Sequence, residues 1–432
     1  MFKMFHYMKE RWYYIVMIVA LLFVQAFCDL SLPDYTSKII NVGIQQKGVE
    51  DGVPETIREE SMDKLLLFLE QEEAEEVLDA YKNKDGIYEL QSVTEEEREE
   101  LNQILGIPEL VVTGLSDEES EETKKIKEQM ELPKEADLFQ VFQSMPKEQL
   151  QTMTEEMKKE LEEMPDSIVT QSAVLFVEQE YEAQDIDMDK LQMEYILMSG
   201  VKMLGLAFLA MAAAIAVTFL SARVAAVLGR NLRNSIYRKV ISFSGRELNQ
   251  FSTASLITRS TNDVQQVQML FTLLFRIVLY APILGIGGVY KVFQTDASMT
   301  WILALAVVVI MLFVVLLFRI AMPKFTRLQF LIDELNLVSR EILTGVPVVR
   351  AFSREKHEEE RFEEANARLT KTNLFVNRCM TFMMPVMMLL MNGVTVLIVW
   401  NGAHAVNEGS MQVGNMMAFM QYAMQIIMAF LM

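Results

Sequence analysis

Side chains that serve catalysis or hold metals are scarce in this sequence of 432 residues. It has two cysteines, Cys28 and Cys379, and three histidines that lie far apart along the chain. These counts exclude a disulfide framework and a metal centre built from cysteine or histidine. The phosphate-binding pattern Gly-x-x-x-x-Gly-Lys-Ser/Thr is absent, so these residues cannot hold a nucleotide in a P-loop. We expect no catalytic residue, no metal ligand and no cofactor bound by this chain alone.

Charge is distributed very unevenly along the chain. There are 59 acidic and 39 basic side chains, a net charge of −20, and yet 51% of the residues are hydrophobic. Residues 47–194 hold 43 of the acidic and 14 of the basic side chains, which is a net charge of −29. The rest of the chain is basic, with a net charge of +9, and strongly apolar. This split excludes a single globular domain and predicts an acidic segment inserted into an apolar frame.

Six apolar runs reach or approach the length that crosses a bilayer as a helix, about 20 residues. They cover residues 12–28, 203–222, 264–290, 297–318, 379–403 and 409–432. The third contains one charge, Arg276, near its polar end, where a long side chain can reach the interface. The sequence therefore predicts an all-α membrane protein with six transmembrane helices.

Basic residues indicate the orientation of these helices, because short cytoplasmic loops are enriched in Lys and Arg. Seven basic residues lie in the loop 223–263 and ten in the loop 319–373, whereas the short loops after the third and fifth runs hold only Lys291. This alternation predicts a multi-pass protein of the plasma membrane with a cytoplasmic N-terminus. The loops 223–263 and 319–373 are then cytoplasmic and the acidic segment is extracellular. The basic residues adjoin membrane segments, so no nucleic acid partner is expected.

The predicted domains are 1–46 (N-terminal stub and first span), 47–194 (extracellular insertion) and 195–432 (spans two to six with both inner loops). The insertion is expected to be mostly helical. A stripe of apolar residues at helical spacing runs from Leu65 to Tyr81, and Thr94 followed by Glu97 forms a capping-box pattern. Further helices are expected from Thr152 or Thr154 to 161 and over 168–181. A lid or partner-docking domain and a solvated acidic appendage are both compatible with this segment.

The spacing Asp185-x-Asp187-x-Asp189 is typical of the start of a calcium loop. The sixth position of such a loop needs glycine and the twelfth needs glutamate. Here those positions are Lys190 and Ile196, so we expect no calcium site.

The two inner loops, like the insertion, have helical patterns. Transmembrane helices two to five are therefore expected to extend far into the cytoplasm and to turn back in pairs. Such long extensions are levers that a cytoplasmic partner can move, and a simple channel or anchor does not need them.

Three stretches together resemble the transmembrane domain of a type IV ABC exporter half-transporter, the multidrug-exporter-like kind. They are 32–43 (LPDYTSKIINVG), 256–267 (LITRSTNDVQQV) and 340–355 (REILTGVPVVRAFSRE), the last followed by Glu360-Arg361-Phe362. A large insertion between spans one and two resembles one subunit of certain heterodimeric bacterial exporters. The resemblance implies the ABC exporter type 1 transmembrane fold, a second half-transporter as partner, with a heterodimer preferred over a homodimer, and a bacterial source.

In this family, short coupling helices at the tips of both inner loops dock on ATPase domains that bind ATP and Mg. By position, the resemblance places these tips near 249–255 and 328–336. The residues implied to couple to the ATPase are Gln250, Phe251, Ser252, Thr253, Leu328, Phe330, Asp333, Glu334 and Leu335.

The chain departs from the family in having no P-loop, and it ends at Met432 within an apolar run. We expect an ATPase domain to follow, and a stand-alone permease with a separate ATPase chain is the alternative.

The fifth and sixth apolar runs and their immediate flanks contain 13 of the 32 methionines, and flexible thioethers suit a surface that repacks around varied apolar ligands. Polar residues in these runs favour a cavity or a helix–helix hydrogen bond equally. The candidate cavity residues are Met384, Met388, Asn392, Met420, Gln421, Met424 and Gln425.

These observations predict the membrane subunit of an ATP-driven exporter that moves amphipathic or lipophilic compounds, such as a drug, lipid or peptide, by alternating access. A multi-span receptor or scaffold with an extracellular ligand-sensing domain is the alternative. An importer or ion-driven carrier is disfavoured because the runs are nearly free of charge at mid-membrane.

Overall fold

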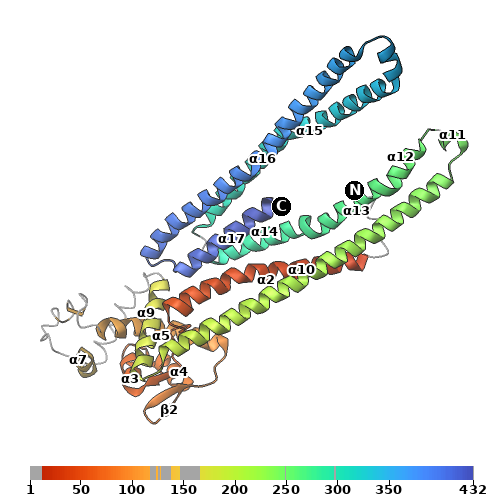
Figure 1. Ribbon diagram of the computed structural model, residues 1–432. Helices are drawn as coiled ribbons and strands as arrows, with labels where there is room; N and C mark the ends of the chain where they lie inside the picture. Colours follow the sequence, from red (N-terminus) through yellow and green to blue (C-terminus); the bar gives the residue numbers. More distant parts are fainter. Residues whose placement is uncertain are drawn as a thin grey trace.

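Long helices dominate the computed structural model, which describes residues 12–116, 123–124, 127, 138–145, 166–248, 250–295 and 298–431. Figure 1 shows three parts: a central bundle, two helical arms that leave it on one side, and a small domain on the opposite side. The predicted stub residues before 12 and the helix expected near Thr152 lie outside the described residues.

The bundle and arms consist of helices in a single order along the chain. Their bounds are α2 (Trp12–Lys38), η2 (Ile39–Gln45), α10 (Met188–Ile241), α11 (Gly245–Leu248), α12 (Thr253–Thr258), η3 (Arg259–Asp263), α13 (Val264–Leu273), η4 (Leu274–Val278), α14 (Tyr280–Thr295), α15 (Thr300–Ala351), α16 (Glu355–Asn407) and α17 (Val413–Leu431).

Five helical stretches in the described part of the chain are long and apolar enough to span a membrane. They are Trp12–Gln45, Met188–Ile241, Thr253–Thr295, Thr300–Ala351 and Glu355–Asn407. Each contains one of the first five predicted runs. The helix at the sixth run, α17, has 19 residues and is less apolar than these five. Its polar residues Asn415, Gln421 and Gln425 lower its mean hydropathy, so it is not counted among them.

Helix α2 is central because two apolar cores meet on it. One core joins it to α10, α13 and η4 through fully buried Ile18, Leu22, Phe271 and Phe275. The other joins it to α14, α15, α16 and α17, with Tyr422 and Phe419 of α17 among the buried side chains. The N-terminal helix is therefore held from both sides by helices that follow the insertion.

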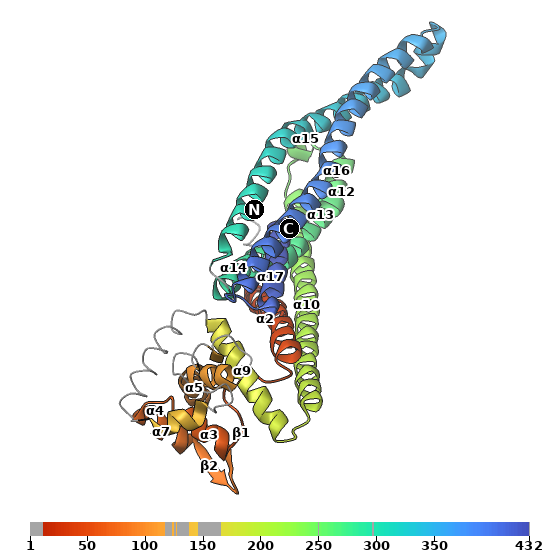
Figure 2. The ribbon, with the colours of Figure 1, turned by 90° about the vertical axis from the view of Figure 1, so that its left-hand side faces the viewer.

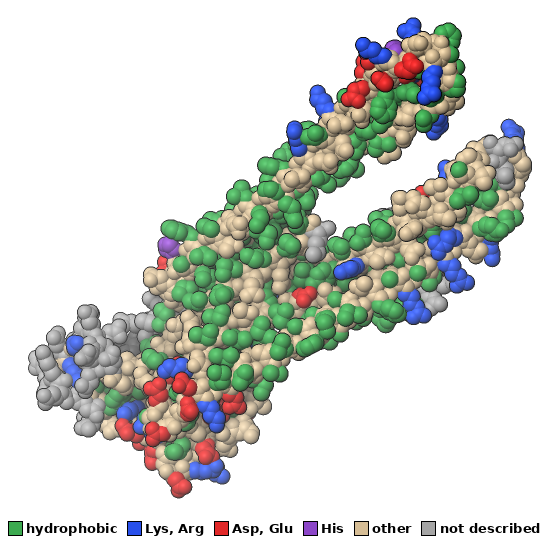
Figure 3. Space-filling model, viewed as in Figure 1, with side chains coloured by type: hydrophobic (Ala, Val, Ile, Leu, Met, Phe, Trp, Pro, Cys, Tyr) green, Lys and Arg blue, Asp and Glu red, His purple; other side chains and the backbone are tan. Residues whose placement is uncertain are grey.

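The two arms diverge from this bundle. The first consists of α10 with α11, α12 and α13, and the second is the hairpin of α15 and α16 (Figure 1). The second arm also extends away from the rest of the molecule in the perpendicular view (Figure 2). Charged side chains gather at both arm tips and over the small domain, whereas hydrophobic side chains cover the stretch between (Figure 3). This distribution is the one expected of a body embedded in lipid with polar ends in water.

The small domain coincides with the predicted insertion, and it mixes helices with a sheet. Its elements are β1 (Thr56–Arg58), α3 (Glu59–Leu66), α4 (Gln71–Ala80), β2 (Tyr81–Lys84), β3 (Ile87–Leu90), α5 (Glu95–Ser116), α7 (Leu138–Ser144) and α9 (Asp166–Ala183).

The antiparallel sheet, with strand order β1-β3-β2, was not predicted from the sequence, which indicated a mostly helical insertion. Its hairpin turns at Asp85 and Gly86, both with positive φ. Asp-Gly between two strands is a strong hairpin signal, so this turn was legible in the sequence.

Several of the expected helix boundaries are confirmed in the insertion. Thr94 and Glu97 form the predicted capping box, in which the Thr94 N–H donates to Glu97 Oε2 at 2.7 Å. Helix α9 contains the predicted 168–181 helix. Asp187 accepts a hydrogen bond from the Lys190 N–H, which caps the start of α10. Because α10 begins at Met188, the predicted domain boundary at 194 falls inside a continuous helix.

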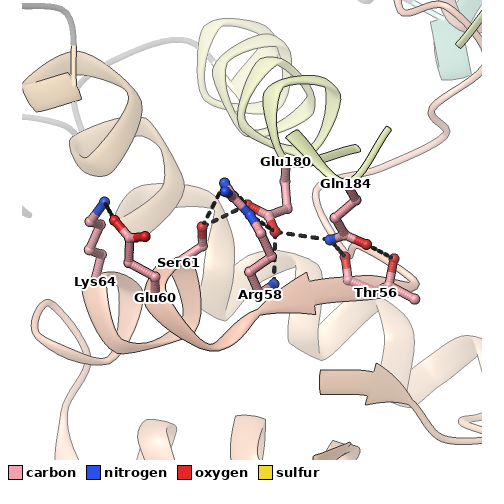
Figure 4. Close-up of polar contacts among 7 residues, drawn as sticks. All are labelled: Thr56, Arg58, Glu60, Ser61, Lys64, Glu180 and Gln184. Carbon is pink, nitrogen blue, oxygen red and sulfur yellow. Dashed lines mark hydrogen bonds and ion pairs between the residues drawn. The ribbon is translucent and has the colours of Figure 1, made fainter. Parts of the chain in front are cut away.

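A buried carboxylate ties the first and last parts of the insertion together (Figure 4). Glu180 of α9 accepts hydrogen bonds from Arg58 Nε at 2.9 Å, the Arg58 N–H at 2.7 Å and Ser61 Oγ at 2.6 Å. Gln184, one turn later, accepts from Thr56 Oγ1 at 2.8 Å. Burial raises the pKa of Glu180, but the hydrogen bonds outweigh burial, so the pKa is lowered overall and the group stays ionised.

Glu109 of α5 is the opposite case. It is fully buried, and neither of its carboxyl oxygens has a hydrogen-bond partner among the described residues. Burial, with a smaller contribution from the negative charge of Asp51, raises its pKa well above the usual value for glutamate. The pKa values of Glu180 and Glu109 therefore shift in opposite directions, because their neighbours differ.

Candidate translocation path and coupling ends

Ion pairs and hydrogen bonds join α2, α14 and α17 near the insertion side of the bundle. Asp34 of α2 accepts a hydrogen bond from Lys291 Nζ of α14 at 2.6 Å and another from the Tyr422 hydroxyl of α17. One turn earlier on α2, Asp29 accepts a hydrogen bond from the Tyr280 hydroxyl. These contacts hold charged groups in pairs, as apolar surroundings require.

A second polar cluster fastens the start of α17 to η2. The Asn415 Oδ1 atom accepts hydrogen bonds from Ser37 Oγ at 2.7 Å and Asn41 Nδ2 at 3.1 Å, and the Gly414 N–H donates to Asn41 Oδ1 at 2.7 Å. A Cβ atom at Gly414 would lie only 2.4 Å from that oxygen, so the close approach requires glycine. This contact between α17 and η2 is called the seam below. The π-helix η2 lies at the seam, and single π-turns are often found at functional sites.

Sequence reasoning missed both clusters. Their members lie more than 250 residues apart in the chain, and each alone is an isolated polar residue in or beside an apolar run. The only signal was the presence of Asp29 and Asp34 directly after the first run. Together the two clusters hold α2, η2, α14 and α17 against one another on the insertion side of the bundle.

At the tip of the first arm, the predicted contact residues are gathered as expected by position. The rings of Phe243 and Phe251 stack with centroids 5.8 Å apart, and the guanidinium of Arg259 lies 5.3 Å from the Phe251 centroid. Ser252 caps α12 by accepting from the Ser255 N–H at 3.2 Å. Gln250 is exposed and Thr253 begins α12. The predicted coupling helix near 249–255 lies between two short helices, α11 (Gly245–Leu248) and α12 (Thr253–Thr258).

The residues of the second predicted contact set, 328–336, lie within α15, which continues without a break to Ala351. Leu328, Phe330, Asp333, Glu334 and Leu335 lie about five to seven turns before the turn at Phe352–Arg354. Their role in coupling stays a prediction. Pro323 and Pro347 are accommodated within the helix, so proline did not mark its end. The chain reverses where Ser353 adopts a positive φ of 49°.

Two ion pairs link the helices α15 and α16 of the second arm. Glu334 Oε1 lies 2.7 Å from Arg368 Nη2, and Glu341 Oε2 lies 2.5 Å from Arg361 Nη2. Near the turn, a cavity of about 680 Å³ opens between the helices, with Leu343, Val346 and Phe362 among its lining residues and glutamates beside them. Glu334 thus forms an ion pair within the arm, while the surface near the turn is available to a partner.

The candidate cavity residues do not form one cluster in the single chain. Met384, Met388 and Asn392 follow each other at four-residue spacing on one exposed face of α16. On α17, Met420 packs against the bundle core, whereas Met424 is 40% exposed and Gln421 is half-buried.

Gln425 makes a defined contact between helices. Its Nε2 donates to the Asp29 carbonyl oxygen at 3.1 Å, which is helix–helix hydrogen bonding. This contact accounts for a polar residue in α17 without a ligand.

The architecture is that of a helical membrane protein with two long arms (Figure 1). The sequence family of the ABC transporter transmembrane region matches residues 174–430, more than half of the chain. The chain belongs to this family. The match begins within α9, so most of the insertion lies outside it.

Relatives agree with this assignment. The chain is 38% identical, over 54% of its length, to an uncharacterized ABC transporter ATP-binding protein of Mycobacterium tuberculosis (strain ATCC 25618 / H37Rv), of which 40% is covered. It is 33% identical, over 55% of its length and 41% of the relative, to the uncharacterized ABC transporter ATP-binding protein YfiB of Bacillus subtilis (strain 168). An ATP-dependent lipid A-core flippase of Syntrophus aciditrophicus (strain SB) is 27% identical over 48% of this chain and 34% of the relative. The matched segment spans about two fifths of the length of the first two relatives.

Proposed function

We propose that this chain is the transmembrane subunit of an ATP-driven exporter that moves amphipathic or lipophilic compounds by alternating access. The observation that carries the proposal is the pair of arms. Helix α15 has 52 residues, a length of about 78 Å, against about 30 Å of hydrocarbon in a bilayer. The excess length makes each arm a lever between the bundle and a cytoplasmic machine.

The machine in this proposal is a pair of ABC ATPase domains that bind ATP and Mg, because the relatives that align are named as ATP-binding proteins. The second transmembrane subunit is another half-transporter, with a heterodimer preferred on account of the insertion. The polar clusters at Asp34 and Asn415 act as the closed outer gate, and the exposed methionines of α16 face the substrate path. The name of the flippase relative favours a lipid-like substrate.

Orientation is tested first by labelling single cysteines in intact cells with a membrane-impermeant maleimide. The background is Cys28→Ala with Cys379→Ala, and the exposed test sites are Glu96→Cys in the insertion and Lys356→Cys beyond the second turn. The proposal predicts labelling of the first site in intact cells and of the second only after permeabilisation. The reverse pattern would reject an extracellular insertion.

Coupling is tested with the same background, expressed together with the ATPase domains. A short bifunctional cross-linker is expected to join Lys356→Cys to an ATPase domain, and Phe330→Cys, about six turns before the turn at Phe352–Arg354 and also exposed, serves as the matched control. Cross-linking at position 330 and not at position 356 would support coupling through the predicted residues 328–336 and contradict coupling through the turn.

Transport itself is measured as ATP-dependent uptake of ethidium into inside-out vesicles that contain the complete transporter. Vanadate is expected to abolish the uptake. A receptor or scaffold, the alternative function, would show ligand-dependent protection of the insertion and no ATP-dependent uptake.

A further inference from the structure

Five basic side chains converge on one cavity in the second arm. The cavity measures about 600 Å³ and lies between Lys324 and Arg327 of α15 and Arg368, Lys371 and Arg378 of α16. Only Arg368 has a carboxylate partner, Glu334 at 2.7 Å, and the Lys324 ammonium lies 5.6 Å from the centroid of the Phe375 ring. The pocket thus carries an excess of positive charge that the described residues do not neutralise, and such an excess favours an anion.

An apolar groove continues this pocket toward the bundle. It has a volume of about 160 Å³ and is lined by Phe313, Leu316, Leu317, Ile320, Cys379 and Phe382. On α15 the groove residues and the basic residues follow each other at spacings of three and four, which places them on one helix face. On α16, Arg378 of the basic pocket and Cys379 of the groove are adjacent in the chain. The two cavities follow each other along the same pair of helices, and together they are called the track below.

The track lies at the depth of the lipid headgroups. The charge-free part of α15 ends at Phe318, and Lys324 lies about 9 Å further along the helix. The charge-free part of α16 begins directly after Arg378. The basic pocket is therefore in the headgroup zone and the apolar groove is in the hydrocarbon.

We propose that the track between α15 and α16 binds an anionic phospholipid of the leaflet on the arm side, with its phosphate among Arg327, Lys371 and Arg378 and an acyl chain in the apolar groove. A free phosphate would satisfy the basic pocket but leave the groove without an occupant, so a lipid is the ligand that uses both. Basic pockets between transmembrane helices on the cytoplasmic side are suited to such headgroups. The site goes beyond the proposed transport function and does not depend on its direction.

General enrichment of basic residues near the membrane is the simpler explanation, and the first arm provides the contrast. Arg238, Lys239 and Arg246 are exposed near its tip, but the cavity next to this arm's helices has a single basic residue, Arg233, among polar uncharged neighbours. Basic residues occur in both arms, and a convergent pocket with an apolar extension is found in the second.

The test titrates the full chain in detergent with phosphatidylglycerol and counts bound lipid by native mass spectrometry. The variant Arg327→Gln/Lys371→Gln/Arg378→Gln is expected to bind about 100-fold more weakly, since each base near an anionic lipid surface contributes roughly a factor of five. The matched control, Arg238→Gln/Lys239→Gln/Arg246→Gln, loses the same charge and is expected to bind like the unmodified chain. Equal binding by the two variants would overturn the proposal.

Two further measurements separate a lipid from a free anion. Ile320→Trp fills the groove and is expected to weaken phosphatidylglycerol binding, while millimolar inorganic phosphate is expected to compete poorly. An unaffected Ile320→Trp variant together with full competition by phosphate would make the pocket a free-anion site. Photo-cross-linking with an acyl-diazirine phosphatidylglycerol needs no variant, so it remains decisive if the triple variant misfolds. Adducts are expected within 313–320 and 379–382, and adducts confined to other segments would refute the site.

Discussion

The insertion and the second arm bury their apolar side chains to very different extents. In the insertion, Leu65, Val77 and Val177 are completely inaccessible. In the second arm, Leu312, Leu343 and Phe352 are between 69% and 75% exposed. Leu312 lies in the apolar run, where lipid can cover it, but Leu343 and Phe352 are near the turn, far from the hydrocarbon. The insertion therefore completes its core within this chain, whereas the arm leaves apolar side chains exposed along its length and near its turn.

The ion pairs of the two regions differ in the same way. Glu180 is almost fully buried and accepts several hydrogen bonds, while the Glu341–Arg361 pair of the arm is open to water on both sides. Buried charges cannot lose a partner without a large cost, and exposed ones can. Substitutions in the insertion are therefore expected to affect folding, and those in the arm to affect binding.

The largest effect is expected from Glu180→Ala. It leaves Arg58 and Ser61 without their acceptor at the centre of the insertion and should cost about 3 kcal/mol. Hydrogen exchange of the full chain should speed up in peptides from 56–66 and 170–184. Glu60→Ala, which removes the exposed pair with Lys64, is the control and should cost below about 0.5 kcal/mol. Equal exchange in the two variants would contradict the contrast between buried and exposed pairs.

A smaller effect is expected at the seam between α17 and η2. Gly414→Ala places a methyl group against Asn41 and the Ser37 carbonyl and should cost about 2 kcal/mol by overpacking. The measurement is thermal unfolding of the purified chain in detergent. Gly393→Ala in α16 meets no atom within 4 Å and should raise stability slightly through helix propensity, by up to about 1 kcal/mol. A neutral Gly414→Ala would show that the seam is looser than its contacts indicate.

Glu109 makes the stability of the insertion depend on pH. Its pKa is raised in the folded chain, so between the unfolded and folded pKa values the folded state binds more protons. Stability then falls as pH rises above the unfolded value, by about 1.4 kcal/mol for each pH unit. Glu109→Gln should remove this loss, seen as slower hydrogen exchange of peptides from 101–112 at pH 8 and little change at pH 4. Glu96→Gln, at an exposed site of the same helix, should leave the pH profile unchanged.

The smallest effect is expected from Glu341→Ala in the second arm. The pair with Arg361 is about half exposed on both sides, so its loss should cost under about 0.5 kcal/mol. The unfolding temperature in detergent should stay the same at low and high salt. A drop that grows at low salt would mean that surface ion pairs, and not the packing between α15 and α16, hold the arm together.

Local signals explain what could be predicted. The first five spans can be predicted because the length of an apolar run decides whether a helix can cross the hydrocarbon. The Thr94–Glu97 capping box is legible because its partners lie three residues apart. The Asp85-Gly86 turn signal was equally local, but the helical spacing of the stripe from Leu65 to Tyr81 favoured a mostly helical insertion.

The second arm separates the position of a turn from the role of its residues. The coupling role of 328–336 was predicted from the family pattern by position alone and stays a prediction, whereas the turn itself lies at Phe352–Arg354. The charges marked the actual turn, because Arg350 is in the last turn of α15, and Glu355 and Glu358 are in the first turn of α16. Basic residues at the end of a helix and acidic residues at the start of the next favour a break between them.

Taken by itself, the sequence determined the membrane-spanning stretches, the split between an acidic insertion and a basic frame, and the family. These follow from properties of consecutive residues. The tertiary structure alone decided that Asp34 meets Lys291 and Tyr422, that the pKa of Glu180 is lowered while that of Glu109 is raised, and that five basic residues of two helices converge on one pocket. Each of these depends on which distant segments pack together. Hydrophobic burial drives that packing, but it is not directional, so the local sequence does not specify which segments meet.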